Sequence, residues 1–162
     1  MNISLRHDGW AEKVPAILYS WYGGTEGCNA LCRVLFGDVN PSGKLPFTIP
    51  LSADQLPYFS STDREISYDL YHGYTLADKK GYQPSFPFGF GLSYTTFQYS
   101  NLRLTAKEIP TEGDLYVSVD VSNTGSCSGE EVVQLYIGFP SANVDRPIKL
   151  LRDFVKNPTL SR

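Results

Sequence analysis

The 162-residue sequence has few of the residues that build metal centres and disulfide frameworks, with only three cysteines and two histidines. No two cysteines have the spacing of a metal-binding knuckle with partner histidines, so we expect three free thiols, no metal site and no cofactor. Cys28 and Cys32 are expected to be small, buried apolar side chains. The 14 basic residues do not outnumber the 17 acidic ones, which argues against a nucleic-acid partner.

Long hydrophobic runs are also missing. The longest lies around Val14–Leu18 and is interrupted by Pro15, whereas a membrane-spanning helix needs about 20 apolar residues. Residues 1–8 carry Arg6 but neither the apolar segment nor the small-residue cleavage site of a secretory signal. We therefore expect no membrane partner and a cytoplasmic location, unless the sequence begins inside a longer chain.

Turn formers and aromatic rings are abundant, with 14 glycines, 11 prolines, 11 tyrosines, 9 phenylalanines and 2 tryptophans. This composition predicts a folded, turn-rich protein that leans towards β-structure. A length of 162 residues fits one ordinary domain or two small ones, so the number of domains has to come from patterns along the chain.

The first fifty residues predict half of an α/β repeat. Lys13–Tyr22 is an almost continuously apolar run, the pattern of a strand buried on both faces of a parallel sheet. Glycines turn the chain at 23–27, and Cys28–Phe36 places its apolar side chains on one helical face before Gly37 ends the helix. Lys44–Pro50 then predicts an edge strand, because prolines are excluded from the middle of a sheet.

Residues 51–91 lack a lasting periodicity, so we expect a connecting arm with one short strand near Glu65–Tyr74. The arm is expected to be ordered, because its many aromatic rings require burial. From Thr95 the pattern changes to an alternation of apolar and polar residues, which is typical of antiparallel strands. Four strands are predicted, at Phe97–Leu104, Leu115–Val121, Val133–Ile137 and Ile148–Phe154.

Both halves are incomplete by this count. A buried parallel strand needs parallel neighbours and helices on both faces, whereas the first fifty residues supply one strand and one helix. An immunoglobulin-like sandwich takes about seven strands, whereas the second half supplies four. We therefore predict a mixed α+β chain that joins the end of an α/β domain to part of an antiparallel β-sandwich.

Two glycine-rich motifs are candidate sites. The turn at 23–27 follows a strand and opens a helix, where open α/β sheets place ligands, but it equally fits a tight turn whose Glu26 favours the helix dipole. The rings of Phe86–Phe97 could stack on sugars, but we favour a role in packing between two domains. Ser93 misses the last glycine of a nucleophile elbow and is predicted to be an ordinary turn serine.

A third candidate is acidic. His72 follows Asp69 by three residues, with Asp63 and Glu65 nearby, and paired carboxylates are the minimum for glycoside hydrolysis. Sequence proximity does not set the separation of two carboxylates, so we favour a solvated acidic stretch at this place.

Five motifs follow one another in a specific order and cover nearly the whole chain. They are Trp21–Gly27 with Val34–Thr48, Phe86–Phe97, Val121–Gly125, Glu130–Tyr136 and Arg146–Lys149. Together they closely resemble the carboxyl-terminal part of family-three glycoside hydrolases, a family dominated by β-glucosidases with related xylosidases and exo-glucanases. The sequence departs from the commoner family pattern at Tyr71–Thr75, where a glycine-tyrosine-arginine stretch is usual.

The resemblance implies that residues 1–50 end an α/β sandwich domain, that 51–94 form a connecting arm, and that 95–162 belong to a fibronectin type III-like sandwich. In the family, the aspartate nucleophile lies in an upstream barrel and the glutamate acid/base lies before the Trp21 motif. No catalytic residue is therefore carried over to this sequence. The loop with Trp21, Tyr22 and Glu26 is expected to face the crevice between domains and to contact substrate.

We therefore expect the carboxyl-terminal portion of a β-glucosidase-like hydrolase, inactive when isolated. Its complete form would cleave terminal β-linked glucose from β-glucosides or oligosaccharides by a retaining mechanism. The alternative is a non-catalytic carbohydrate-binding or domain-assembly module. Unpaired sheet edges and exposed domain interfaces also predict self-association of the isolated chain.

Overall fold

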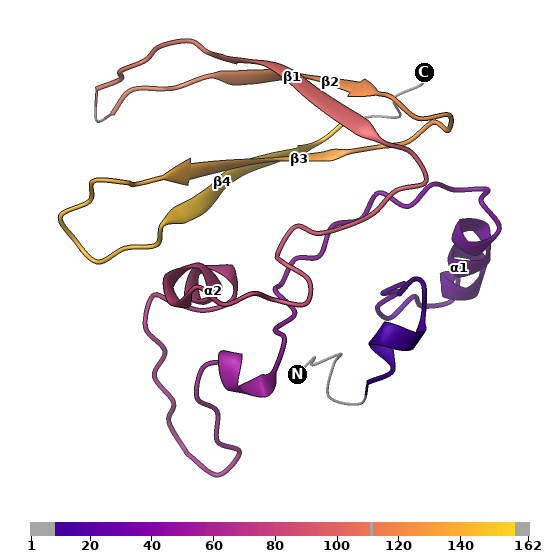
Figure 1. The fold of residues 1–162 in the computed structure, drawn as a ribbon, viewed down its shortest axis with the longest axis horizontal. Coiled ribbons are helices and arrows are strands. Elements are labelled where there is room, and N and C mark those ends of the chain that lie inside the picture. The colour runs from indigo at the N-terminus through magenta and orange to yellow at the C-terminus, as the bar shows by residue number, and fades with distance from the viewer. Residues whose placement is uncertain (1–8, 111, 158–162) are drawn as a thin grey trace.

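The computed structural model describes residues 9–110 and 112–157. Within them the chain forms two short α-helices, two single turns of 3₁₀-helix and four β-strands (Figure 1). Their bounds are η1 Ala11–Lys13, α1 Gly27–Leu35, η2 Ala53–Gln55, α2 Tyr74–Lys80, β1 Phe97–Leu104, β2 Val117–Asn123, β3 Val132–Gly138 and β4 Lys149–Lys156. No helix in this part of the chain is long and apolar enough to cross a membrane.

The four strands predicted after residue 95 are confirmed. β1 pairs with β2, and β3 pairs with β4, each as an antiparallel two-stranded sheet. The two sheets lie one above the other in Figure 1, and α2 lies on the far side of β3 and β4. In β2 the side chains of Val117 and Val119 are half-buried whereas that of Ser118 is exposed, which is the alternation that predicted the strand. The mixed fold with antiparallel sheets is thus confirmed, while the boundaries at residues 50 and 94 stay predictions.

The helix predicted at Cys28–Phe36 is confirmed as α1, but the strand predicted at Lys13–Tyr22 is wrong. Residues after the turn η1 are irregular, and Ile17 and Leu18 are 37% and 46% exposed. A parallel strand is held by hydrogen bonds from parallel neighbours, and the described residues offer none. Apolar content alone therefore does not make this segment a strand.

The edge strand predicted at Lys44–Pro50 is reduced to an isolated bridge. The Ile49 N–H donates to the Phe86 carbonyl at 2.8 Å, and the Phe86 N–H donates to the Ile49 carbonyl at 3.2 Å. Four residues earlier the same two segments meet again, because the Leu45 N–H donates to the Phe90 carbonyl at 2.8 Å and the Gly89 N–H donates to the Leu45 carbonyl at 2.7 Å.

The short strand predicted near Glu65–Tyr74 is also wrong. The chain is irregular up to Gly73 and then forms α2, which ends where Gly81 adopts the left-handed conformation at φ +65°. The helix brings the ring of Tyr74 against that of Phe88, with centroids 5.0 Å apart. The residues before α2 thus find no neighbouring strand among the described residues to pair with.

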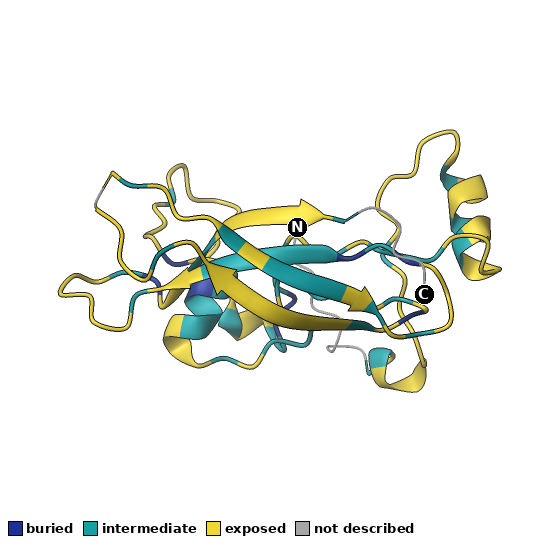
Figure 2. Ribbon diagram, turned by 90° about the horizontal axis from the view of Figure 1, so that it is seen from above, coloured by how far each residue is buried: buried dark blue, intermediate teal, exposed yellow. Residues whose placement is uncertain are grey.

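The chain buries very little apolar surface. Among the described residues the buried apolar side chains are few, namely Ile49, Pro50, Tyr71 and Pro147. The exposed area of 12323 Å² compares with about 8,000 Å² expected for a folded monomer of 18.1 kDa. Figure 2 accordingly shows exposed and intermediate residues over both helices and all four strands. Large apolar side chains such as Tyr22 and Phe36, 95% and 83% exposed, have no core to enter.

A cluster of three side chains fastens the loop between β3 and β4 to the connecting arm. We call Tyr71, Lys79 and Asp145 the Asp145 cluster. The Asp145 carboxylate accepts hydrogen bonds from the Tyr71 hydroxyl at 2.5 Å and from the Lys79 ammonium at 2.9 Å. Lys79 also lies 3.5 Å from the centroid of the Tyr71 ring. The hydrogen bonds from Tyr71 and Lys79 lower the pKa of Asp145 below its ordinary 3.8.

The lowered pKa of Asp145 predicts an acid-sensitive contact. Its ionised form stabilises the folded chain above pH 3.8, and this contribution is lost as the pH falls through the lowered pKa. We expect Asp145→Asn to lower the melting temperature at neutral pH, with a difference from the unmodified chain that shrinks as the pH falls below 3.8. Thermal melts followed by circular dichroism over a pH series measure this.

Asp114→Asn is the matched control for the pH series, because Asp114 is exposed and forms no hydrogen bond or ion pair within residues 9–110 and 112–157. Its melting temperature should follow that of the unmodified chain at every pH. A constant difference between Asp145→Asn and the unmodified chain at all pH values would contradict the role given to the Asp145 carboxylate.

Candidate functional site

The loop that leads into α1 has a constrained backbone. Trp21 has a φ of +53°, which is uncommon for a bulky side chain. A Cβ atom at Gly23 would lie 2.6 Å from the Gly27 Cα, so the turn closes only with glycine at position 23. Such backbone strain persists only where the surrounding structure holds it in place.

Three aromatic rings meet at the beginning of this loop. The ring centroids of Tyr19 and Trp21 lie 4.7 Å apart, those of Trp21 and Phe47 5.5 Å apart, and those of Tyr19 and Phe47 5.6 Å apart. The rings meet edge to face, at interplanar angles of 78°, 89° and 69° respectively. We call them the aromatic triad. Tyr19 and Phe47 are half-buried, whereas Trp21 is 57% exposed, so the triad presents its indole to the surface.

The other two residues predicted to contact substrate lie outside the triad. Glu26 directly precedes α1, where its carbonyl accepts the Ala30 N–H and its carboxylate accepts the Asn29 side-chain amide at 2.7 Å. Tyr22 is 95% exposed. The substrate-contacting role of Trp21, Tyr22 and Glu26 stays a prediction, and so do the two alternatives for the glycine turn.

The acidic candidates of the connecting arm are not brought together. Asp63 accepts a hydrogen bond from the Tyr58 hydroxyl at 2.9 Å, and Asp69 accepts one from the backbone N–H of Tyr71 at 2.7 Å. All the acidic residues at 63–69, Glu65 among them, and His72 are exposed. Within the described residues no hydrogen bond joins His72 to a carboxylate, which fits a solvated stretch.

The three cysteines are free thiols, as predicted, but the expected burial of two of them is wrong. Cys28 and Cys32 are exposed on α1, and Cys127 is exposed as well. Cys28 and Cys32 are exposed because no other helix or sheet of the described chain packs closely on α1. In this part of the chain, no three His, Cys, Asp or Glu side chains lie close enough together to hold a metal ion.

A network of polar side chains joins the segment after α1 to the β-strands. We call it the polar joint, and its central residues are Asn40, Lys44, Thr95, Asn123 and Glu131. All five lie within the five motifs that carry the family resemblance, but none of them is a candidate site residue from the sequence. The only feature of the sequence that indicates the polar joint is the presence of polar residues and glycines within those motifs.

One amide connects three segments of the joint. The Asn40 side-chain oxygen accepts the Ser93 hydroxyl and the Tyr94 N–H, both at 2.8 Å, and its nitrogen donates to the Ser128 carbonyl at 3.0 Å. Ser93 is thus a turn serine, as predicted. The Tyr94 hydroxyl in turn donates to the Val34 carbonyl at 2.7 Å, which ties the last turn of α1 to the same network.

Glycines allow the segments of the joint to approach. The Asn123 side-chain oxygen accepts the hydroxyl of buried Thr95 at 2.6 Å and the Gly125 N–H at 3.1 Å. A Cβ atom at Gly125 would lie 2.2 Å from the Thr95 hydroxyl oxygen, and one at Gly129 would lie 2.7 Å from the Asn40 amide nitrogen. Any side chain at these positions would push the segments apart.

The joint also contains a nearly buried ion pair. Lys44 and Glu131 lie 3.1 Å apart, with side chains only 17% and 11% exposed. Lys44 donates a further hydrogen bond to the Gly91 carbonyl at 3.0 Å, and Glu131 accepts one from the Tyr99 hydroxyl at 2.8 Å. Burial, followed by this hydrogen bond to Glu131, raises the pKa of Tyr99. The charges are thus removed from water only where polar partners replace it.

The rings of the Phe86–Phe97 motif have a packing role. Phe86 and Phe90 have centroids 5.2 Å apart, and Phe88 packs on Tyr74 of α2. All three phenylalanines are half-buried. This agrees with packing rather than sugar stacking for these rings, while their expected place between two domains stays a prediction.

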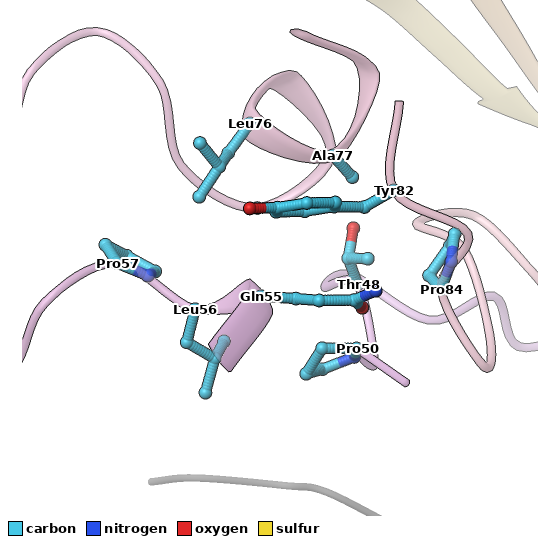
Figure 3. A pocket seen from close by; sticks show the side chains of 10 residues that line it. Thr48, Pro50, Gln55, Leu56, Pro57, Leu76, Ala77, Tyr82 and Pro84 are labelled. Atoms are coloured by element: carbon cyan, nitrogen blue, oxygen red, sulfur yellow. The ribbon is translucent and has the colours of Figure 1, made fainter. Parts of the chain in front are cut away.

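A small cavity lies between η2 and α2 (Figure 3). Figure 3 shows the Tyr82 ring above the Gln55 side chain, with Thr48 between the two levels, Pro84 to the right and Pro50 below Gln55. Its volume of about 30 Å³ admits a water molecule but not a sugar ring. The Thr48 hydroxyl is buried there without a hydrogen-bond partner among the described residues.

The ion pair of the joint predicts a large loss of stability when one partner is removed. Glu131→Gln leaves the Lys44 ammonium nearly buried without a counter-charge, and we expect it to lower the free energy of unfolding by about 3 kcal/mol. Urea denaturation followed by circular dichroism measures the change. Glu130→Gln is the matched control, because Glu130 pairs with Lys156 in a more exposed place, 36% and 52% exposed, where solvent screens the charges. Equal losses in the two variants would contradict the importance of the buried pair.

Two families match the chain. The family described as Glycosyl hydrolase family 3 C-terminal domain matches residues 4–94, which is more than half of the chain. The family described as Fibronectin type III-like domain matches residues 131–160. The second match includes β3 and β4, whereas β1 and β2 lie between the two matched regions.

Curated relatives are similar over nearly the whole chain. It is 45% identical over 156 residues to the beta-glucosidase BoGH3A of Bacteroides ovatus, which covers 91% of this chain and 21% of the relative. It is 43% identical over 144 residues to a beta-xylosidase of Formosa agariphila, which covers 89% of this chain and 20% of the relative. The chain thus spans about a fifth of the length of the relatives that it matches.

Solved structures agree with the sequence relatives. Beta-glucosidase 3B from Thermotoga neapolitana, in complex with alpha-D-glucose, superposes with a TM-score of 0.86 at 35% identity, over 98% of this chain and 23% of that one. A beta-glucosidase from Kluyveromyces marxianus in complex with glucose superposes with a TM-score of 0.82 at 39% identity, over 94% of this chain and 18% of that one.

Proposed function

Because the chain belongs to the glycosyl hydrolase family 3 C-terminal domain family, we propose that it completes the fold of a β-glucosidase-like enzyme without carrying that enzyme's catalytic carboxylates. The chain matches the C-terminal part of such enzymes over about a fifth of their length. The observation that carries the proposal is the lack of a core. Because the described residues bury so few apolar side chains, the large exposed apolar surface of the chain fits a partner polypeptide rather than water.

The helix α1 is the clearest part of this surface. Leu35 and Phe36 at its C-terminal end are 62% and 83% exposed, although they are large and apolar. No other helix or sheet of the described chain packs closely on α1. We propose that the remainder of a family 3 hydrolase covers this helix, because an exposed apolar helical face is stabilised by burial against another element.

We also propose that the loop with Trp21, Tyr22 and Glu26 lies at the crevice between this chain and the remainder of the enzyme. The loop directly precedes α1, so covering α1 brings the partner polypeptide close to the loop. A terminal β-glucosyl residue of a β-glucoside or oligosaccharide is the proposed substrate of the complete enzyme, and hydrolysis with retention is its proposed reaction. The beta-glucosidase relatives support this substrate class.

Complementation in two pieces tests the proposed function. We expect the 162-residue chain alone, and the Bacteroides ovatus beta-glucosidase from which the matching region has been removed, to be inactive on a chromogenic β-glucoside. Mixing the two should restore hydrolysis, with a rate that saturates as this chain is added. A mixture that stays inactive, while the complete relative is active in the same assay, would contradict the proposal.

A variant of α1 serves as the control for complementation. Leu35→Asp should greatly reduce the restored activity and leave the circular dichroism of this chain unchanged, because the side chain is already 62% exposed. Hydrolysis by the chain alone would place the catalytic carboxylates within it. Single alanine substitutions of Glu26, Asp63, Glu65 and Asp69 would then identify them.

The exposed surface also supports self-association of the isolated chain. The sheets β1–β2 and β3–β4 each leave both outer edges unpaired within the described residues, and exposed apolar side chains such as Phe154 and Val155 lie on β4. We expect light scattering to give a mass above 18.1 kDa for the isolated chain, and a single one-to-one complex in place of these oligomers when an equimolar amount of the truncated relative is added. A monomer at every concentration tested would contradict this expectation.

A further inference from the structure

We infer that the aromatic triad of Tyr19, Trp21 and Phe47 is a preassembled platform for the apolar face of a glucosyl ring. In this inference the Trp21 indole makes the contact, and Tyr19 and Phe47 act as positioning residues. The inference rests on the proposed function for its sugar class. Tyr19 and Phe47 are thereby added to the candidate site, because neither was a candidate from the sequence.

The indole is held before any ligand arrives. Tyr19 and Phe47 both meet Trp21 edge to face, with centroids 4.7 and 5.5 Å away, and they also meet each other at 5.6 Å. The backbone of Trp21 at φ +53° adds a conformation that a bulky residue rarely adopts. A side chain held by two rings and a fixed backbone loses little conformational freedom on binding, so more of the contact energy appears as affinity.

The chemistry around the indole fits a neutral sugar. A pyranose ring has a face of C–H groups that packs on a flat aromatic surface, and hydroxyl groups around its rim that need hydrogen-bond partners. On the same loop, the Glu26 carboxylate is oriented by the Asn29 amide at 2.7 Å. Carboxylate and amide groups together can accept from and donate to hydroxyls. We therefore include Glu26, which lies on the same loop but outside the triad, as the proposed acceptor for a sugar hydroxyl.

The main competing explanation is that the rest of the enzyme simply covers Trp21. Its exposure of 57% resembles that of other apolar side chains on this chain, such as Leu35 at 62%. The two explanations differ in one measurable way. A platform stays open to small molecules after the complete enzyme assembles, whereas an interface closes.

Tryptophan fluorescence gives a direct test, because the sequence contains only Trp10 and Trp21. In the full chain with Trp10→Phe, the emission reports Trp21 alone. We expect a saturable change on titration with cellobiose. Sorbitol, which has hydroxyls but no ring, should produce no change. A second variant, which keeps Trp10 and carries Trp21→Phe, should show no cellobiose response.

The positioning role is tested by a matched pair of phenylalanines. Phe47→Leu in the single-tryptophan chain should weaken cellobiose binding by up to about tenfold, because it removes the edge-to-face support of the indole. Phe36→Leu should leave the affinity unchanged, because Phe36 is 83% exposed and forms no ring contact within the described residues. Emission maxima of the ligand-free variants give a readout beyond affinity, since only Phe47→Leu should shift the Trp21 emission.

Three results would overturn the platform. One is an absent or sorbitol-like response in a Trp10→Phe chain with unchanged circular dichroism. A second is equal weakening by Phe36→Leu and Phe47→Leu. The third is loss of both acrylamide quenching and the cellobiose response of Trp21 on complementation with the truncated Bacteroides ovatus enzyme. In the third case hydrolysis is restored, so the proposed function stands while the platform fails. If complementation fails while the cellobiose response of Trp21 is intact, the platform stands and the proposed function fails.

Discussion

The nearly buried ion pair between Lys44 and Glu131 is the contact on which the arrangement of the two halves of the chain depends. Two charges can leave water only if each finds polar partners, and here the Gly91 carbonyl and the Tyr99 hydroxyl supply them. In most small proteins a hydrophobic core would orient the elements. This chain has almost none, so directional hydrogen bonds and one ion pair of the polar joint take over that task. A polar joint has the further property that it specifies one geometry, because its partners must meet at fixed distances and angles.

The joint also connects the β-strands to the candidate substrate loop. Asn40 holds the chain beside Tyr94, and Tyr94 reaches the carbonyl of Val34 in α1. The loop with Trp21 immediately precedes α1, so its position relative to the strands follows from the same network. Under the proposed function, the apolar side chains that remain exposed are buried against the remainder of a family 3 hydrolase. The chain thus combines an internal geometry held by polar contacts with an outer surface suited to a large apolar interface.

Local patterns in the sequence predicted much of the fold. The alternation of valines with serines in β2, and the apolar side of α1, depend only on residues that are near one another in the chain. The strand expected at Lys13–Tyr22 failed because a parallel strand needs neighbours that the described residues do not contain. The strand expected near Glu65–Tyr74 failed because residues 65–73 have no strand to pair with among the described residues. In both cases the deciding partner lies outside the segment itself.

The sequence by itself determined the four strands, α1 and, through its ordered motifs, the hydrolase family. It also placed Trp21 and Glu26 on one loop. Only the tertiary structure decided that Asn40 meets Ser128, 88 residues away, and that Phe47 supports Trp21. The physical reason is that periodicity records how a segment faces its surroundings, whereas a contact between distant residues depends on where the whole backbone brings them. Polar side chains and glycines in loops have no periodicity, so their partners emerge only when the chain is folded.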